Sequence, residues 1–417
     1  MMRHRILIDA ILRLEPLILG IIGFAFWYPA PPRDQWLWLL ALFIPVLGAR
    51  WAKYGRVWTP TPLDGWLLAL LALMIVNWAA APYTRGFIMF SRPLFGVALY
   101  GAFVEHARER RNLDRLLTAT TWLALLVGLL SLTATQWNSK SAPLSPIIDV
   151  LPTLQGFPGA EGGFNANEIA GAITWLQPLA IGIAAYRWRV RQPYMGALSA
   201  AILLTAGVFL GQSRLAIIGV GAAMGLLALV AVRQKAVRVL ALVVLVLAAG
   251  LEYVIFSYPV QVTRETGLSS RDEQSLIGRQ DIWGSALNIL RDYPLTGVGM
   301  SMFRDGRVRE RYPAPGYRGT VLPHAHNEWL QVGADFGVPG IVVFAGWHLA
   351  AGSMLIYSWR KGSDGQKTIA AALLAALLAH GVFGLADAIT LWDRFIFVYW
   401  WLLALIGAQF AMLKCAE

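Results

Sequence analysis

Blocks of apolar residues recur along the chain and are separated by short polar connections. Each block approaches the ~20 residues that an α-helix needs to cross ~30 Å of hydrocarbon. The blocks predict spans at 15–30, 35–49, 63–81, 87–104, 116–134, 166–186, 194–211, 215–232, 236–256, 338–358, 366–386 and 390–413. The pattern therefore predicts an all-α integral membrane protein with about twelve transmembrane helices, of which 35–49 is the shortest.

Two connections are too long to be simple turns, and the longer of them covers residues 257–337. It predicts a helical loop domain between transmembrane helices in 1–256 and those in 338–417. Inside it, a helix is predicted over 278–291. Apolar residues in it and just before it share roughly one face, at helical spacing: Leu276, Trp283, Leu287 and Leu290. Pro294 and Gly297 are expected to end that helix.

The distribution of positive charge predicts the orientation of the spans. The chain is 57% hydrophobic and only 14% charged, against roughly a quarter in a soluble domain. Alternate connections are rich in Lys and Arg, and such connections lie in the cytoplasm: Arg50, Lys53 and Arg56, then Arg108 to Arg115, Arg187 to Arg191, Arg233 to Arg238 and Arg360 to Lys367. Both termini are predicted to be cytoplasmic. The net charge of +11 thus reflects topology and contact with membrane lipids, and no nucleic-acid partner is expected.

Two arginines are candidates for binding an anion at the outer membrane face. Arg214 lies in the short turn Gly211–Arg214 between two spans. A charged side chain so close to the membrane is energetically costly and therefore suggests a partner or a function. Arg279 precedes Trp283 by one helical turn, which predicts a place near the buried face of its helix. The alternatives are snorkelling to lipid phosphate for Arg214 and an anionic protein partner for Arg279.

Histidine is scarce, and two of the six lie together in Pro323-His324-Ala325-His326-Asn327-Glu328. A His-x-His pair suggests a metal site, but positions i and i+2 of a helix diverge by about 200°. Because no third ligand has a recognisable spacing, neither a metal nor another cofactor is expected. An ordinary interfacial histidine is the other alternative. Asp387 and Asp393, in the last outer turn, are candidates for catalysis or for pairing with arginines.

The residues after His326 carry a resemblance to a known family. His326-Asn327 is followed by nine residues, Gly337, two residues and Gly340, a spacing similar to that of O-antigen ligases and related bacterial oligosaccharide transferases. The resemblance extends over about 165–345. It includes three further segments: Asn165 to Glu168, Ser213 to Ala216, and Arg279 through Trp283 to Gly299. The same glycines also predict close helix packing, through Gly333 and Gly337.

The resemblance implies a GT-C-like, inverting, metal-independent glycosyltransferase in the bacterial inner membrane with a periplasmic active site. It implies a donor glycan on undecaprenyl pyrophosphate and a sugar hydroxyl of lipid A–core as acceptor. His326 would be the catalytic base and Arg214 and Arg279 would bind the pyrophosphate. Secondary roles would fall to His324, Asn327, Asp387 and Asp393.

Other functions fit the same pattern of residues. An O-antigen polymerase or a protein O-oligosaccharyltransferase would share the chemistry and differ in acceptor. A transporter or flippase for lipid-linked glycans is the alternative outside enzymes. Against it stands the concentration of Arg and His in the outer loop rather than along the spans.

Overall fold

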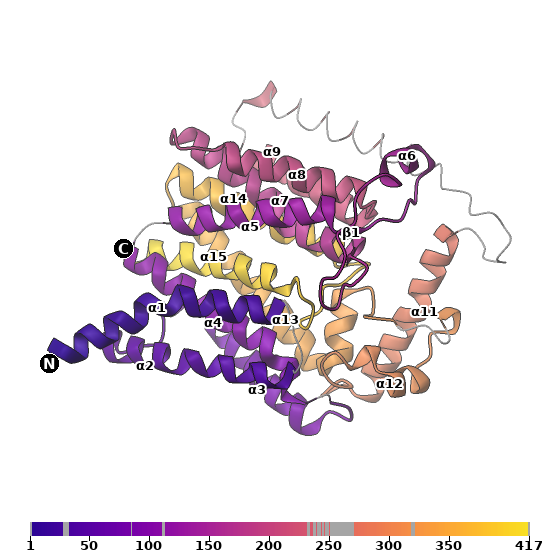
Figure 1. The fold of residues 1–417 in the computed structure, drawn as a ribbon, viewed down its shortest axis with the longest axis horizontal. Helices are drawn as coiled ribbons and strands as arrows, with labels where there is room; N and C mark the ends of the chain where they lie inside the picture. Colours follow the sequence, from indigo (N-terminus) through magenta and orange to yellow (C-terminus); the bar gives the residue numbers. More distant parts are fainter. Residues whose placement is uncertain are drawn as a thin grey trace.

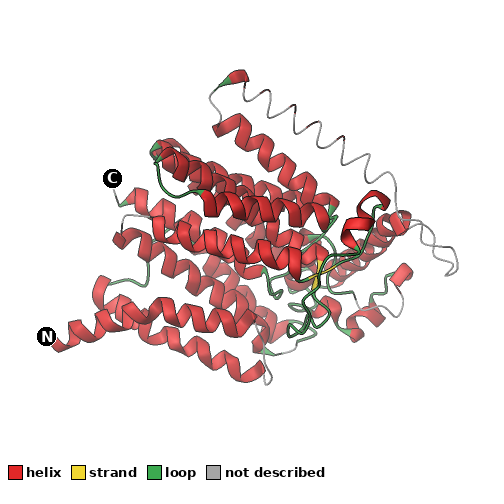
Figure 2. Ribbon diagram, turned by 45° about the horizontal axis from the view of Figure 1, so that its top comes forward, coloured by secondary structure: helices red, strands yellow, loops and turns green. Residues whose placement is uncertain are grey.

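The computed structural model describes residues 2–27, 33–84, 86–110, 113–231, 271–317 and 322–415, with scattered positions between 234 and 250. These residues are mostly helical, and the loops gather towards one end of the molecule (Figure 2). The expectation of an all-α protein is confirmed. The predicted span 236–256 lies almost entirely outside the described residues.

The helices follow one another along the chain with short connections. Their bounds are α1 Met2–Trp27, η1 Arg33–Leu42, α2 Phe43–Tyr54, α3 Asp64–Ala80, η2 Phe87–Phe90, α4 Ser91–Arg110, α5 Asp114–Thr133, η3 Ala142–Leu144, α6 Ser145–Ile148, α7 Ala166–Arg189, α8 Met195–Leu210, α9 Arg214–Ala231, α11 Arg271–Asp292, η5 Met302–Arg304, α12 Gly306–Arg311, η6 Pro315–Tyr317, α13 Glu328–Lys361, α14 Asp364–Phe383 and α15 Ile396–Lys414. Two short strands, β1 Thr135–Gln136 and β2 Phe164–Asn165, pair in parallel.

Six helices within the described residues are long and apolar enough to cross a membrane: those at Ile88–Arg108, Asp114–Thr133, Ala166–Arg189, Glu328–Lys361, Asp364–Phe383 and Ile396–Lys414. The shorter apolar helices α3, α8 and α9 also occupy predicted spans. The chain is therefore a multi-pass membrane protein, and the count of twelve spans stays a prediction.

The predicted span 35–49 is not one α-helix. The chain forms the 3₁₀ helix η1 up to Leu42 and only then the α-helix α2. Pro45 explains the change, because its ring would clash with the carbonyl of Ala41 in a continuous α-helix. In the first turn of α2 the same proline is tolerated.

The two ends of the helical bundle differ in character. Figure 1 shows both chain termini at one end and α11 and α12 at the other. Arg187 and Arg189 end α7, and Arg360 and Lys361 end α13, at the end of the bundle opposite to that where α7 and α13 begin. The termini and these cations thus lie at the end of the bundle opposite to α11 and α12.

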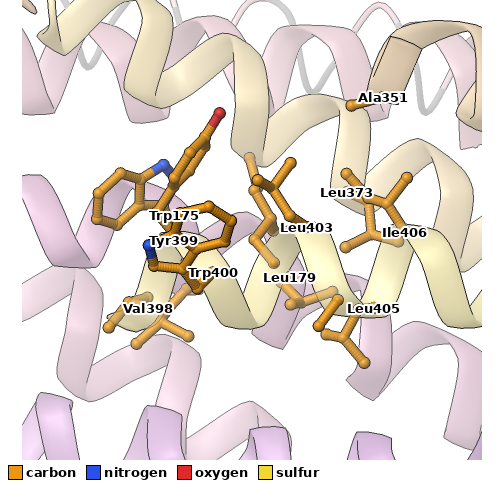
Figure 3. Close-up of a cluster of buried hydrophobic side chains, with 14 of the residues drawn as sticks. Trp175, Leu179, Ala351, Leu373, Val398, Tyr399, Trp400, Leu403, Leu405 and Ile406 are labelled. Atoms are coloured by element: carbon orange, nitrogen blue, oxygen red, sulfur yellow. The ribbon is translucent and has the colours of Figure 1, made fainter. Parts of the chain in front are cut away.

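The core of the bundle centres on α15, which packs against α4, α7, α13 and α14. Figure 3 shows its aromatic part, where Trp175 of α7 lies beside Tyr399 and Trp400 of α15. Trp400 is fully buried. A Cβ at Gly96 of α4 would lie 2.1 Å from the indole of Trp400, so glycine at this position lets α4 and α15 approach closely.

A second, smaller core lies within the outer loop, the long connection 257–337. It is formed between α11, η5 and α12. Its buried side chains include Ile282 and Ile289 of α11 and Phe303 of η5. The helix ends at Asp292, before Pro294 as predicted. The expected buried face was wrong in detail: Leu287 is 52% exposed, because Ile282, Ala286 and Ile289 make the buried stripe instead.

Helix α13 is broken at Gly337, where φ is +71°. A Cβ at this position would lie 2.4 Å from the carbonyl oxygen of Pro294, and the amide of Val338 donates to that oxygen at 2.7 Å. Glycine is therefore required both by the backbone conformation and by the close approach. Gly337 separates a short outer segment, 328–336, from the long membrane segment.

Asn77 of α3 ties this broken helix to the outer loop. Its Nδ2 donates to the carbonyl oxygens of Thr296 (3.0 Å) and Asp335 (2.7 Å). Its Oδ1 accepts from the amide of Met300 at 2.9 Å. Three backbone groups near the break are thus hydrogen-bonded by one buried side chain, as buried polar groups require.

Candidate active site

A cavity of about 350 Å³ lies at the end of the bundle where α4, α7, α13 and α15 begin and α1 and α14 end. Its lining combines charged, polar and aromatic side chains from helix ends that are distant in sequence. They are Ala25, Phe26, Ile88, Ser91, Arg92, Gly159, Asn165, Asn167, Glu168, Arg304, Pro323, His324, His326, Asp387, Trp392, Asp393 and Arg394. Four predicted site residues, His324, His326, Asp387 and Asp393, are therefore neighbours in space.

The two histidines come together because the segment before α13 is not helical. Ala325, between them, is fully buried, and its amide donates to Gln331 Oε1 at 2.8 Å. The rings of His324 and His326 meet edge to face, with centroids 4.4 Å apart. The two rings can face one point because the segment is not helical, although it is turned at His326 rather than extended.

The backbone of His326 has a positive φ of 49°, which is uncommon for a residue with a Cβ. Its carbonyl accepts from Trp283 Nε1 of α11 at 3.2 Å, and its amide donates to His324 Nδ1 at 3.2 Å. Such a conformation persists where the surroundings fix it and is concentrated at functional sites. Helix α11 thereby holds the histidine segment in place.

The hydrogen bond to His324 Nδ1 fixes the proton on the other nitrogen of that ring. An amide N–H can only donate, so Nδ1 accepts and the neutral ring carries its hydrogen on Nε2. His324 Nε2 lies 3.7 Å from Asp387 Oδ1, and His326 Nδ1 lies 3.3 Å from the same oxygen. Asp387 thus faces both rings, and a proton on His326 Nδ1 leaves Nε2 of that ring as the basic nitrogen.

The charges of this cluster follow from its burial. Desolvation lowers the pKa of His324 to about 4, although the Asp387 carboxylate acts in the opposite direction. His324 is therefore neutral at pH 7. Burial acts to raise the pKa of Asp387, but its interactions with His326, and then with His324, lower it to about 2. A buried carboxylate thus stays ionised beside His326.

His324, His326 and Asp387 also have three ligand atoms within 4.8 Å of one another, close enough to surround a metal ion. The tautomer of His324, with its hydrogen on Nε2, argues against metal binding. A metal on His324 Nε2 would require the proton to move to Nδ1, where it would meet the amide N–H of His326. Histidine ligands normally donate through the second nitrogen to an acceptor, and here that nitrogen faces a donor. The hydrogen bonds therefore favour a histidine–carboxylate dyad.

Two of the arginines in the cavity are held by the outer ends of α1 and α7. Arg92, at the start of α4, donates to the carbonyl oxygen of Phe26 at 3.0 Å and lies over the ring of Trp392. Arg394 donates to the carbonyl oxygen of Gly159 at 2.5 Å, and its Nε lies 3.6 Å from Glu168 Oε1. Both guanidinium groups are oriented by these contacts before any ligand binds.

The third arginine, Arg304, comes from the outer loop. Its Nη2 lies 3.3 Å from Asp393 Oδ1, and Asp393 Oδ2 accepts from the amide of Thr390 at 2.6 Å. The acidic side chains of Glu168, Asp387 and Asp393 balance the three arginines in number. Such paired charges, with Trp392, offer donors and acceptors for sugar hydroxyls as well as for phosphate.

Three predicted site residues lie elsewhere among the described residues. Arg214 begins α9 and is exposed, and Arg279 belongs to α11, one turn before Trp283; neither lines this cavity. Asn327 caps α13 instead: its Oδ1 accepts from the amide of Leu330 at 3.0 Å. The structure thus brings His326 together with both aspartates, but not with the two predicted arginines.

Sequence reasoning did not single out Arg92, Glu168, Arg304 or Arg394 as site residues. A signal was present for two of them, because Arg92 and Arg394 fall within the predicted spans 87–104 and 390–413. A charge there needs a partner or a function. Arg304 lies in the long connection 257–337, and only the fold places it beside Asp393.

These features define a multi-pass helical membrane protein with a charged, histidine-containing cavity at one end of its bundle. Residues 199–345 match the family model described as O-Antigen ligase. This match supports the expected resemblance to the O-antigen ligase superfamily, whose domain is of a glycosyltransferase-like kind. The curated proteins include no match to the chain.

Proposed function

We propose that the protein transfers a glycan from undecaprenyl pyrophosphate to a sugar hydroxyl of lipid A–core, with inversion at the anomeric carbon. The observation that supports this most is the 3.3 Å contact between His326 and Asp387 in the cavity of a chain with an O-antigen ligase domain. A polymerase or a protein O-oligosaccharyltransferase would use the same dyad on another acceptor.

The transfer needs a base beside the attacking hydroxyl. His326 Nε2 takes the proton while the hydroxyl oxygen bonds to the anomeric carbon, and the bond from that carbon to the pyrophosphate oxygen breaks. Undecaprenyl pyrophosphate leaves with the bonding electron pair. Histidine is the side chain most often used as a general base, and the ring acts in its neutral form. Asp387 orients the ring and stabilises the imidazolium that forms, the role of a buried carboxylate beside a catalytic histidine.

The departing pyrophosphate needs positive charge. Arg214 and Arg279 are the proposed binding residues, since a guanidinium offers a planar fork of donors for phosphate oxygens. Arg279 shares α11 with Trp283, which contacts the His326 carbonyl. Arg92, Arg304 and Arg394 are a second set, already in the cavity. Because arginines supply this charge, the proposed reaction requires no metal.

The proposed orientation places the cavity on the periplasmic face of the bacterial inner membrane and both termini in the cytoplasm. The support is the clustering of Lys and Arg at the ends of α7 and α13 remote from the cavity. By the positive-inside rule those ends are cytoplasmic.

The activity is tested with purified protein in nanodiscs, labelled lipid-linked glycan and either lipid A–core or no added acceptor. We expect label on lipid A–core, at the rate at which undecaprenyl pyrophosphate is released. Longer lipid-linked chains in the absence of lipid A–core would show a polymerase instead. Movement of glycan across a proteoliposome membrane without formation of a new glycosidic bond would show a transporter and contradict the proposal.

Donor affinity in single alanine variants shows which of the two sets of arginines binds the pyrophosphate. Arg214→Ala and Arg279→Ala should each weaken donor binding by about tenfold to a hundredfold, the equivalent of a hydrogen bond to a charged group. Arg187→Ala is the matched control, because Arg187 ends α7 far from the cavity and bonds Thr118. Loss of affinity in Arg304→Ala and Arg394→Ala, with none in the first pair, would assign the pyrophosphate to the cavity arginines.

A further inference from the structure

A second buried pair lies directly behind the dyad, between the same two segments of the chain. Glu328 Oε1 of α13 lies 2.6 Å from His380 Nε2 of α14. The two side chains are only 12% and 4% exposed. Glu328 follows His326 by two residues, and His380 precedes Asp387 by seven. The contact between Glu328 and His380 therefore joins the same two chain segments as the contact between His326 and Asp387. It lies outside the cavity.

His380 is fixed from its other side by α7. Its ring stacks on the indole of Trp175, with centroids 3.7 Å apart and planes inclined by 23°. Its Nδ1 lies 2.9 Å from Thr174 Oγ1. The contacts with α7 alone therefore fix the position of the His380 ring. Glu328 thus has a rigid partner.

Glu328 connects this rigid partner to the loop that follows α14. Its amide donates to the carbonyl oxygen of Gly384 at 2.9 Å, and its Oε1 accepts from the amide of Ile389 at 3.4 Å. A Cβ at Gly384 would lie 2.7 Å from Glu328 Oε2, so this glycine lets the loop approach the carboxylate. Asp387 lies between the two residues that Glu328 holds.

We infer that Glu328 and His380 are a positioning pair, which sets the Asp387 loop against His326 and thereby aligns the catalytic base. The inference rests on the proposed function of the dyad. Neither Glu328 nor His380 lines the cavity, so neither is expected to touch substrate. A displacement of a catalytic group by about 1 Å can lower a rate about a hundredfold, and a loop with fewer anchors allows such a displacement.

The kinetic test compares Glu328→Ala, Glu328→Gln and His380→Gln with the wild-type protein. We expect Glu328→Ala to lower kcat about tenfold to a hundredfold while KM for the donor is unchanged. Glu328→Gln should recover much of the loss, because its amide oxygen still accepts from Ile389 and its backbone still bonds Gly384. The double variant Glu328→Ala/His380→Gln should be no worse than the poorer single variant, because residues that act as a unit are not additive.

The matched control is His348→Gln. His348 is another buried histidine of α13, and its Nε2 lies 3.0 Å from the Tyr399 hydroxyl. Its ring bonds the Phe344 carbonyl and the Tyr399 hydroxyl rather than the Asp387 loop, so its replacement should leave kcat unchanged. An equal loss of kcat in His348→Gln and Glu328→Ala would overturn the inference, because it would reflect general disturbance of the core. Normal kcat per folded molecule in Glu328→Ala would overturn it as well.

A second measurement does not depend on transfer. Diethyl pyrocarbonate labels accessible imidazole nitrogens, and mass spectrometry gives the labelling rate of His326 alone. We expect this rate to rise severalfold in Glu328→Ala and in Asp387→Asn, because the ring is no longer held against a carboxylate, and to stay unchanged in His348→Gln. An unchanged rate in Glu328→Ala would overturn the inference. Absence of transfer in the wild-type protein, together with the expected labelling, would contradict the proposed function but support the positioning.

Discussion

Replacement of His326 by alanine should abolish glycan transfer while the lipid-linked donor still binds. A positioned general base contributes about 10²–10⁴-fold to a rate, and the cavity of the described structure offers only one alternative imidazole. That alternative, His324, has Nδ1 occupied by the amide of His326 and a pKa near 4, so it is a poor base. The measurements are the initial rate of transfer and the affinity for labelled donor.

His106→Ala is the control for the His326 variant. His106 lies near the end of α4 that is remote from the cavity, whereas Ser91 and Arg92 at its beginning line it. We expect the control to retain both donor binding and transfer. Near-normal transfer by His326→Ala would remove the base from the proposed mechanism, whatever the donor affinity.

Asp387→Asn should have the second largest effect, a fall of about 10²–10³-fold in kcat with little change in donor affinity. The replacement keeps the size of the side chain but removes the negative charge beside His326. An amide also presents its NH₂ group to one of the rings, which favours the wrong tautomer of the base. In the serine protease triad, the equivalent change of a buried carboxylate lowers kcat about 10⁴-fold.

A graded series distinguishes charge from shape in the Asp387 experiment. Asp387→Glu keeps the carboxylate and should recover part of the rate, whereas Asp387→Ala should be at least as poor as Asp387→Asn. The readout is kcat under saturating donor for equal amounts of folded protein. Full activity of Asp387→Asn would show that the ring of His326 needs no anionic partner.

The long spans could be predicted because their signal is local. The block 166–186 became α7 and the block 366–386 became α14 with small differences at the ends. The prediction failed where one residue overrides hydrophobicity, as Pro45 does in 35–49. It also failed for the buried face of α11, since Leu287 and Ile289 are equally apolar and only packing decides which is covered.

The site was predictable as far as its chemistry could be read from short segments. The pair His324 and His326 and the acid Asp387 were all candidates, and the fold brings them within 4.8 Å. Arg92 and Arg394 were not, because their meeting depends on the packing of α4 beside α15. The two predicted arginines were chosen from their positions in the sequence and from the family resemblance, and they lie outside the cavity that contains His326.

The hydrogen bonds of Asn77 have a consequence for any attempt to isolate the region that matches the family model. Residues 199–345 lack Asn77, which bonds the backbone of Asp335 just before the break in α13 and the backbone of Thr296 and Met300 in the preceding loop. They also lack Arg92, Glu168 and Asp387. A fragment trimmed to the matched region would carry the histidine motif without the scaffold that shapes its surroundings. Expression of that fragment alone should therefore yield an inactive protein, and complementation would require co-expression of both flanking pieces.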